Sequence, residues 1–151
     1  MTCIAWDGKT LAADKRAINS GLPRTVTKIH RVKDCLVGAS GDAAQAREML
    51  AWWKSGANPK TFPASQRDKD DWGTFVVISK EGIDVYERTP YPIRFEEKQF
   101  ACGSGRDFAT AAMHLGCNAK QAVEIACRFD VSCGNGIDVL AFKEAASAAQ
   151  K

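Results

Sequence analysis

Short apolar runs separated by turn residues predict a chain rich in paired strands. Three hairpins are expected, each from two such runs around a turn: 3–6 with 9–14, 28–32 with 35–39, and 73–79 with 83–88. The first turn is Asp7-Gly8, and Asp-Gly between apolar runs is a strong hairpin signal. Residues 91–95, 99–103 and 137–142 are predicted as further strands, and residues 19–25, with Gly21 and Pro23, as a loop.

Helical spacing of apolar residues appears in three places. The first helix is expected after Ser40-Gly41-Asp42 and to end at Gly56; the second is expected over 106–115, before Gly116. Asn118 followed three residues later by Gln121 predicts the N-terminal cap of a third helix. The polar stretch 57–71 is expected to be a long loop, and residues 1–151 a single α+β domain.

Composition excludes several classes of function. Hydrophobic residues make up 45% and charged residues 26% of the chain, and the net charge of +3 comes from scattered side chains, so we expect neither nucleic acid nor membrane as a partner. No signal sequence is visible, which favours a cytoplasmic protein. The six cysteines form no Cys-x-x-Cys pair and are not spaced with the two histidines as zinc ligands. We therefore expect reduced thiols, no metal and no cofactor.

Thr2 leads directly into the first predicted strand. Aminopeptidases usually remove an initiator Met that precedes a small residue, and removal would give Thr2 a free α-amine beside its hydroxyl. Such an amine has an unperturbed pKa of about 7.7–8.0 and can take the hydroxyl proton. The pair would be a nucleophile with its own base.

Other residues could assist such a nucleophile. Asp14 and Lys28 could form an anion–cation pair, although each could equally be a solvated surface charge. Gly38 could present an unobstructed N–H to an oxyanion, or could simply serve the helix-entry turn. Ser104 stands between two glycines at a strand-to-helix corner, but no downstream histidine is spaced for a serine hydrolase.

In chain order, these pieces resemble the N-terminal nucleophile hydrolases, and more specifically proteasome β subunits and the related bacterial ring peptidase that works with an ATP-driven unfoldase. The resemblance runs from Thr2 to about Phe142. It rests on six short motifs: Thr2 at a strand start, Leu11-Ala12-Ala13-Asp14, Thr27-Lys28-Ile29, Gly38-Ala39-Ser40-Gly41-Asp42, Gly103-Ser104-Gly105 and Asp130-Val131-Ser132-Cys133-Gly134-Asn135.

The resemblance implies a fold and a set of roles. The fold would be a four-layer αββα sandwich of two antiparallel sheets with a reduced first helical layer, because polar residues 57–71 replace the second long helix. The implied catalytic residues are Thr2 as nucleophile, Lys28 and Asp14 as the pair that lowers its hydroxyl pKa, Gly38 as oxyanion donor, and Ser104 and Asp130 as the groups that order the amine, with Cys133 where the family often has Ser. The implied substrate pocket is lined by Ala17, Val26, Leu36 and Ser40, which favours an apolar or small side chain.

The implied reaction is hydrolysis of a peptide or unfolded protein through an ester on Thr2. A ring homo-oligomer and an ATP-dependent unfoldase partner are implied as well, although the shortened helical layer puts the ring in question. Two alternatives stay open on the same fold: a small-molecule amidase, and a catalytically silent assembly or binding protein. Relatives sometimes hold a cation such as Na⁺ on backbone carbonyls near Phe129, Ser132 and Asn135, but no carboxylate cluster supports one here, so we expect a loop without metal.

Overall fold

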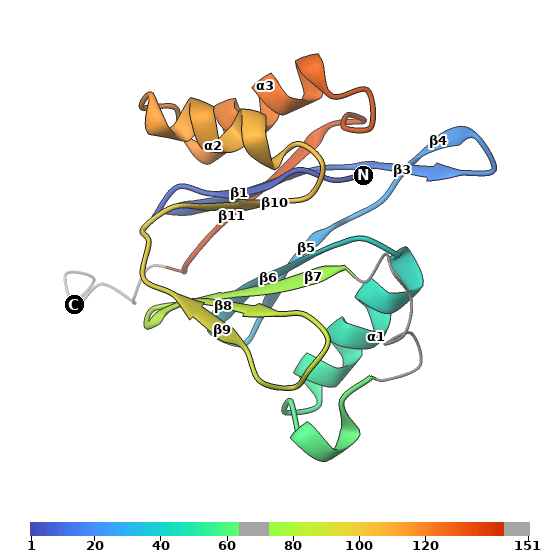
Figure 1. Ribbon diagram of the computed structural model, residues 1–151, viewed down its shortest axis with the longest axis vertical. Helices are drawn as coiled ribbons and strands as arrows, with labels where there is room; N and C mark the ends of the chain where they lie inside the picture. Colours follow the sequence, from blue (N-terminus) through green and yellow to red (C-terminus); the bar gives the residue numbers. More distant parts are fainter. Residues whose placement is uncertain (64–72, 144–151) are drawn as a thin grey trace, which may run out of the picture.

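The computed structural model describes residues 1–63 and 73–143, and these form two antiparallel sheets stacked between helices (Figure 1). The first sheet has four strands in the order β10-β1-β2-β11. Their bounds are Phe100–Cys102, Ile4–Trp6, Thr10–Asp14 and Ile137–Ala141. The N-terminal strand β1 therefore lies inside the sheet, which fixes the position of the residues just before it.

The second sheet has five strands in the order β5-β6-β7-β8-β9. Their bounds are Ile29–Val32, Cys35–Ser40, Thr74–Ser79, Gly82–Tyr86 and Ile93–Phe95. Each of the three predicted hairpins is present, and so are the further strands expected near 91–95, 99–103 and 137–142.

The loop predicted over residues 19–25 is wrong. Strands β3 (Arg16–Asn19) and β4 (Leu22–Thr25) pair there as a two-stranded ribbon that projects from the body of the molecule (Figure 1). The turn is Ser20-Gly21, and both residues have positive φ (51° and 78°), as tight hairpin turns require. Because all four residues of β4 are exposed and one of them is Pro23, the ribbon carries no alternation of buried and exposed positions for a sequence pattern to reveal.

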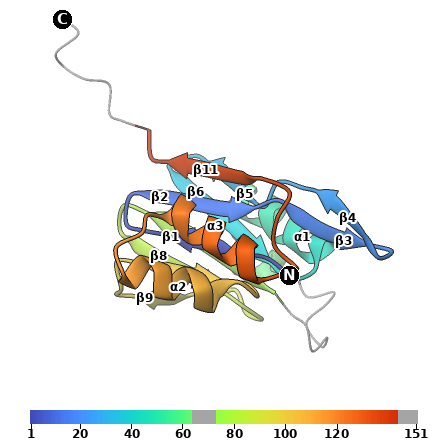
Figure 2. The same cartoon turned by 90° about the horizontal axis from the view of Figure 1, so that it is seen from above.

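Three helices cover the sheets in the described residues. Helix α1 (Ala43–Lys54) lies under the second sheet, whereas α2 (Arg106–His114) and α3 (Ala119–Phe129) cover the first sheet (Figures 1 and 2). Asp42 caps α1 by accepting a hydrogen bond from the N–H of Gln45, and the Asn118–Gln121 capping box at α3 is present as predicted.

Three apolar clusters separate the layers. Small residues of α2 and α3, Ala109, Ala122 and Ala126 among them, pack on Cys3 and Ala12 of the first sheet. Larger residues such as Ile4, Leu11, Leu36 and Ile78 fill the space between the sheets. Aromatic and aliphatic residues join α1 to the outer face of the second sheet, including Met49, Trp52, Phe75 and Tyr86.

The predicted loop over 57–71 contains the short 3-10 helix Pro59–Thr61, and its remainder from residue 64 lies outside the described residues, as does the Ala-rich tail. Within 1–63 and 73–143, no helix is both long enough and apolar enough to span a membrane.

Candidate functional site

A buried carboxylate, Asp14, is the centre of the polar network at the start of β1. Its side chain is fully inaccessible to solvent and ends β2, which pairs with β1. Oδ1 accepts the backbone N–H of Cys3 at 2.9 Å, and Oδ2 accepts the N–H groups of Arg16 at 3.1 Å and Gly134 at 3.0 Å. A buried charge requires such partners, because desolvation without them costs several kcal/mol. Asp14 therefore ties β1, the ribbon and the 131–136 loop to one point.

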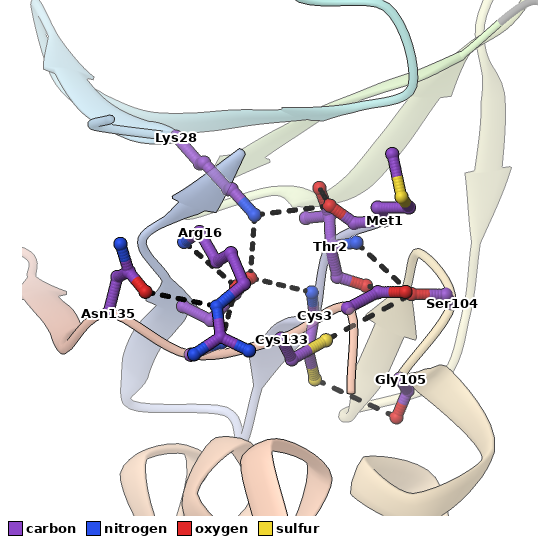
Figure 3. A network of polar contacts seen from close by, with 12 residues as sticks. Met1, Thr2, Cys3, Arg16, Lys28, Ser104, Gly105, Cys133 and Asn135 are labelled. Atoms are coloured by element: carbon purple, nitrogen blue, oxygen red, sulfur yellow. Dashed lines mark hydrogen bonds and ion pairs between the residues drawn. The ribbon is translucent and has the colours of Figure 1, made fainter. Parts of the chain in front are cut away.

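Lys28 supplies the opposite charge. Its Nζ lies 2.8 Å from Asp14 Oδ1 and 3.2 Å from the carbonyl oxygen of Met1, and only 7% of its side chain is exposed. The expected Asp14–Lys28 ion pair is therefore present. Thr2 is 3% exposed, and its Oγ1 donates a 2.6 Å hydrogen bond to the same Met1 oxygen (Figure 3). A carbonyl at this point is thus contacted by the Thr2 hydroxyl and the Lys28 ammonium together.

The Gly103-Ser104-Gly105 corner between β10 and α2 packs directly against Thr2. The N–H of Gly105 donates to the Thr2 carbonyl at 3.1 Å. Gly103 has a φ of 90°, and a Cβ there would collide with the Thr2 carbonyl oxygen. A Cβ at Gly105 would come within 2.8 Å of Cys3 Cβ. Both glycines are therefore needed for the close approach of this corner to β1.

Ser104 connects Thr2 to Asp130 and Cys133. The Ser104 Oγ accepts the N–H of Thr2 at 3.2 Å and lies 3.9 Å from Cys133 Sγ (Figure 3). The same thiol donates to Asp130 Oδ2 at 3.4 Å. Burial, reinforced by the charges of Asp14 and Asp130, raises the pKa of the Cys133 thiol to about 12, so it stays protonated and acts as a donor. Burial alone would raise the pKa of Asp130, but hydrogen bonds from Ser104, Ser132 and Cys133 outweigh it and hold that pKa below its usual value.

A cavity of about 670 Å³ opens beside Thr2, between the β3–β4 ribbon, β6 and the first turns of α1. Gly38 lies on its wall, and a Cβ there would come within 3.0 Å of Ile29 Cγ2 and 3.1 Å of Ile4 Cδ1, which explains the glycine sterically. Ala17 and Val26 line the cavity, as expected for the substrate pocket.

Leu36 and Ser40, which the resemblance also implies for the substrate pocket, are not among the residues that line this cavity. Alternate residues of a strand face opposite sides, and the face of β6 that carries Leu36 packs against the first sheet. Leu36 is fully buried there. The intervening residues Val37 and Ala39 line the cavity instead.

Arg16 is a site residue that sequence reasoning missed. Its Nε donates to Asn135 Oδ1 at 3.0 Å and an Nη donates to the Val131 carbonyl at 2.8 Å, so the guanidinium clamps the loop that carries Cys133 (Figure 3). The positively charged Arg16 side chain thus contacts the 131–136 loop, which is the region where some relatives hold a cation. No group of three His, Cys, Asp or Glu side chains that could hold a metal ion occurs among residues 1–63 and 73–143.

Comparison with known proteins shows which solved structures share this fold. No family model and no curated protein matches the sequence. Among solved structures, the chain is similar to HslV from Trypanosoma brucei, with a TM-score of 0.69, 20% identity and coverage of 95% of this chain and 100% of that one. It is also similar to BPH from Thiobacillus denitrificans, both in complex with epoxomicin (TM-score 0.68, 18% identity, 95% and 99% covered) and alone (TM-score 0.65, 20% identity, 96% and 100% covered). The chain therefore has the α+β fold of the proteasome-like N-terminal nucleophile hydrolases, as the sequence motifs suggested.

Proposed function

We propose that this chain is a threonine peptidase of the proteasome type, with Thr2 as its nucleophile after removal of Met1. The observation that carries the proposal is the position of Thr2. Its hydroxyl shares a carbonyl partner with Lys28, its nitrogen faces Ser104, and it opens on a cavity large enough for a peptide side chain. The proposed nucleophile, the Lys28 ammonium and the cavity therefore all meet at Thr2.

The proposed reaction is acyl transfer followed by hydrolysis. The α-amine of Thr2 accepts the hydroxyl proton as Oγ1 attacks the peptide carbonyl, with Lys28 lowering the hydroxyl pKa and Asp14 fixing the ammonium. The resemblance assigns the tetrahedral oxyanion to the N–H of Gly38, but Gly38 lies inside β6, where it pairs with Ile29 on one side and Val76 on the other, so we propose no oxyanion role for it. The amine then returns its proton to the leaving nitrogen, and water hydrolyses the ester on Thr2.

Ser104 and Asp130 are proposed to order the amine. The Ser104 Oγ already accepts the Thr2 N–H at 3.2 Å, so it stands within hydrogen-bond reach of the future amine. Cys133 holds Asp130 through its thiol hydrogen bond.

Removal of Met1 is an essential part of the proposal. While Met1 is attached, the Thr2 nitrogen is an amide with no basicity, and the Met1 carbonyl takes the contacts that we assign to a substrate carbonyl. Met1 is 58% exposed, so an aminopeptidase can reach it.

The decisive experiment compares Thr2→Ser and Thr2→Ala in hydrolysis of unfolded casein and of fluorogenic peptides. Thr2→Ser keeps a hydroxyl and an amine on one residue and should retain measurable cleavage, whereas Thr2→Ala should lose it entirely. Cleavage by Thr2→Ala equal to that of the unmodified sequence would refute the assignment. Cleavage of small amides without cleavage of any peptide would instead favour an amidase on this fold.

The same reading extends to architecture and partners. We propose that residues 1–151 form one domain with the αββα sandwich of N-terminal nucleophile hydrolases, with α1 as a reduced first helical layer. We further propose a cytoplasmic ring homo-oligomer, fed by an ATP-dependent unfoldase. Light scattering of the purified protein tests the ring directly, since a monomer would contradict it.

A further inference from the structure

The cavity beside Thr2 is asymmetric in charge. Its walls are mostly apolar, formed by residues such as Val26, Val37, Leu50 and Phe75. Four basic side chains also line it, namely Arg16, Lys28, His30 and Arg47, against one acid, Asp42. A ligand in this cavity therefore meets apolar surface together with excess positive charge.

Most of these charges already have protein partners. Lys28 is paired with Asp14, Arg16 is bound to Val131 and Asn135, and Asp42 caps α1 through the Gln45 N–H. Burial, with the nearby Lys54 charge, lowers the pKa of His30, which favours its neutral form.

Arg47 differs from these side chains. It lies in the second turn of α1 and lines the cavity, and it makes no hydrogen bond or ion pair with any residue in 1–63 or 73–143. Its neighbour Glu48 does not line the cavity. Asp42 and Ala43, at the N-terminus of α1, also line the cavity. The helix dipole adds partial positive charge at this end of the helix.

We propose that this cavity selects an acidic side chain, glutamate above all, at the residue whose carbonyl Thr2 attacks. The inference rests on the proposed function and names its substrate class. Thr2 itself lines the cavity, so the side chain beside the attacked carbonyl is the one that we expect to enter it. Glutamate has an aliphatic stem for the apolar walls and a carboxylate that the Arg47 guanidinium can bind through two parallel hydrogen bonds. This specificity replaces the apolar or small side chain expected from the sequence.

The test uses fluorogenic peptides that differ only at this residue, with Glu, Gln, Leu or Lys. Glu and Gln have the same shape, so their ratio of kcat/KM isolates the charge. We expect a Glu/Gln ratio of about 10 or more, because a charge-assisted pair contributes on the order of one power of ten or more. Arg47→Met should reduce the ratio to about 1, and Arg47→Glu should make Lys the preferred residue. Arg31→Met is the matched control, since Arg31 is an exposed arginine on β5 that does not line the cavity, and it should keep the ratio.

A Glu/Gln ratio near 1, a preference for Leu, or a ratio unchanged in Arg47→Met would overturn the inference. Calorimetric binding of the Glu and Gln peptides to Thr2→Ala protein separates this outcome from failure of the peptidase. If no peptide is cleaved but the Glu peptide binds at least tenfold more tightly in an Arg47-dependent way, the acidic site stands and the proposed function falls. Equal binding of the two peptides contradicts the acidic site whatever the activity.

Discussion

Replacing Lys28 by methionine removes the ammonium group from the buried pair while keeping most of the apolar stem. Asp14 would then be left fully buried, with backbone N–H groups from Cys3, Arg16 and Gly134 as its remaining partners. Breaking a buried pair by removing one partner costs about 3–5 kcal/mol. Because three hydrogen bonds to the charge remain, we expect the lower end, about 3 kcal/mol of unfolding free energy. In a domain of this size, that corresponds to a fall in Tm of about 6–12 °C.

Urea denaturation followed by tryptophan fluorescence measures this change. Lys15→Met is the matched control, because Lys15 also lies 2.8 Å from a carboxylate, Asp138, but the two side chains are 23% and 31% exposed. Such a pair contributes about 0–1 kcal/mol. The double variant Lys28→Met with Asp14→Asn should be less destabilised than the sum of the single variants, since the unpaired charge is gone. A loss of less than 0.5 kcal/mol in Lys28→Met would refute the view that this pair organises the site.

Two further predictions concern the residues that hold β1 in place. Gly103→Ala should lose more stability than Gly116→Ala, as measured by urea denaturation: both glycines have positive φ, but nothing lies within 4 Å of a Cβ at Gly116, whereas one at Gly103 meets the Thr2 carbonyl. The positive φ alone costs an alanine about 1–2 kcal/mol at either position. Equal losses of stability in the two variants would therefore contradict an added cost from the contact with the Thr2 carbonyl. Burial would raise the pKa of Asp7, but N–H groups of Thr10, Ala119 and Lys9 hold it below 3.8. Its stabilisation is therefore present above pH 3.8 and lost as pH falls through the lower folded-state pKa, so Asp7→Asn should flatten the acid limb of stability against pH.

Local signals explain why most elements were predictable. The Asp7-Gly8 turn, the Asp42 cap and the Asn118–Gln121 capping box each act within a few residues, so the sequence displays them directly. The β3–β4 ribbon displayed no such signal apart from its Ser20-Gly21 turn. Its strands bury little surface, and a sequence pattern reports burial rather than pairing.

The short sequence motifs predicted some of the site residues, but not those that lie outside the motifs. The resemblance brought Asp14 and Lys28 together correctly, whereas two of its implied pocket residues, Leu36 and Ser40, are not among those that line the cavity beside Thr2. A shift of one position along a strand moves a side chain to the opposite side of the sheet, and no local pattern indicates which face borders a cavity. Arg16 and Arg47 were missed for a related reason. An arginine in a sequence reads as a surface charge until the loop or cavity that it contacts is known.

The central claim is that Thr2 is the first residue and the nucleophile. A peptide epoxyketone tests both parts at once, because its ketone takes the hydroxyl and its epoxide takes the amine of a single N-terminal residue. We expect mass spectrometry of the treated protein to find the adduct on an N-terminal peptide that begins at Thr2, and no adduct in Thr2→Ala. An N-terminal peptide that still begins with Met1 and carries no adduct, in protein from its native host, would contradict the account.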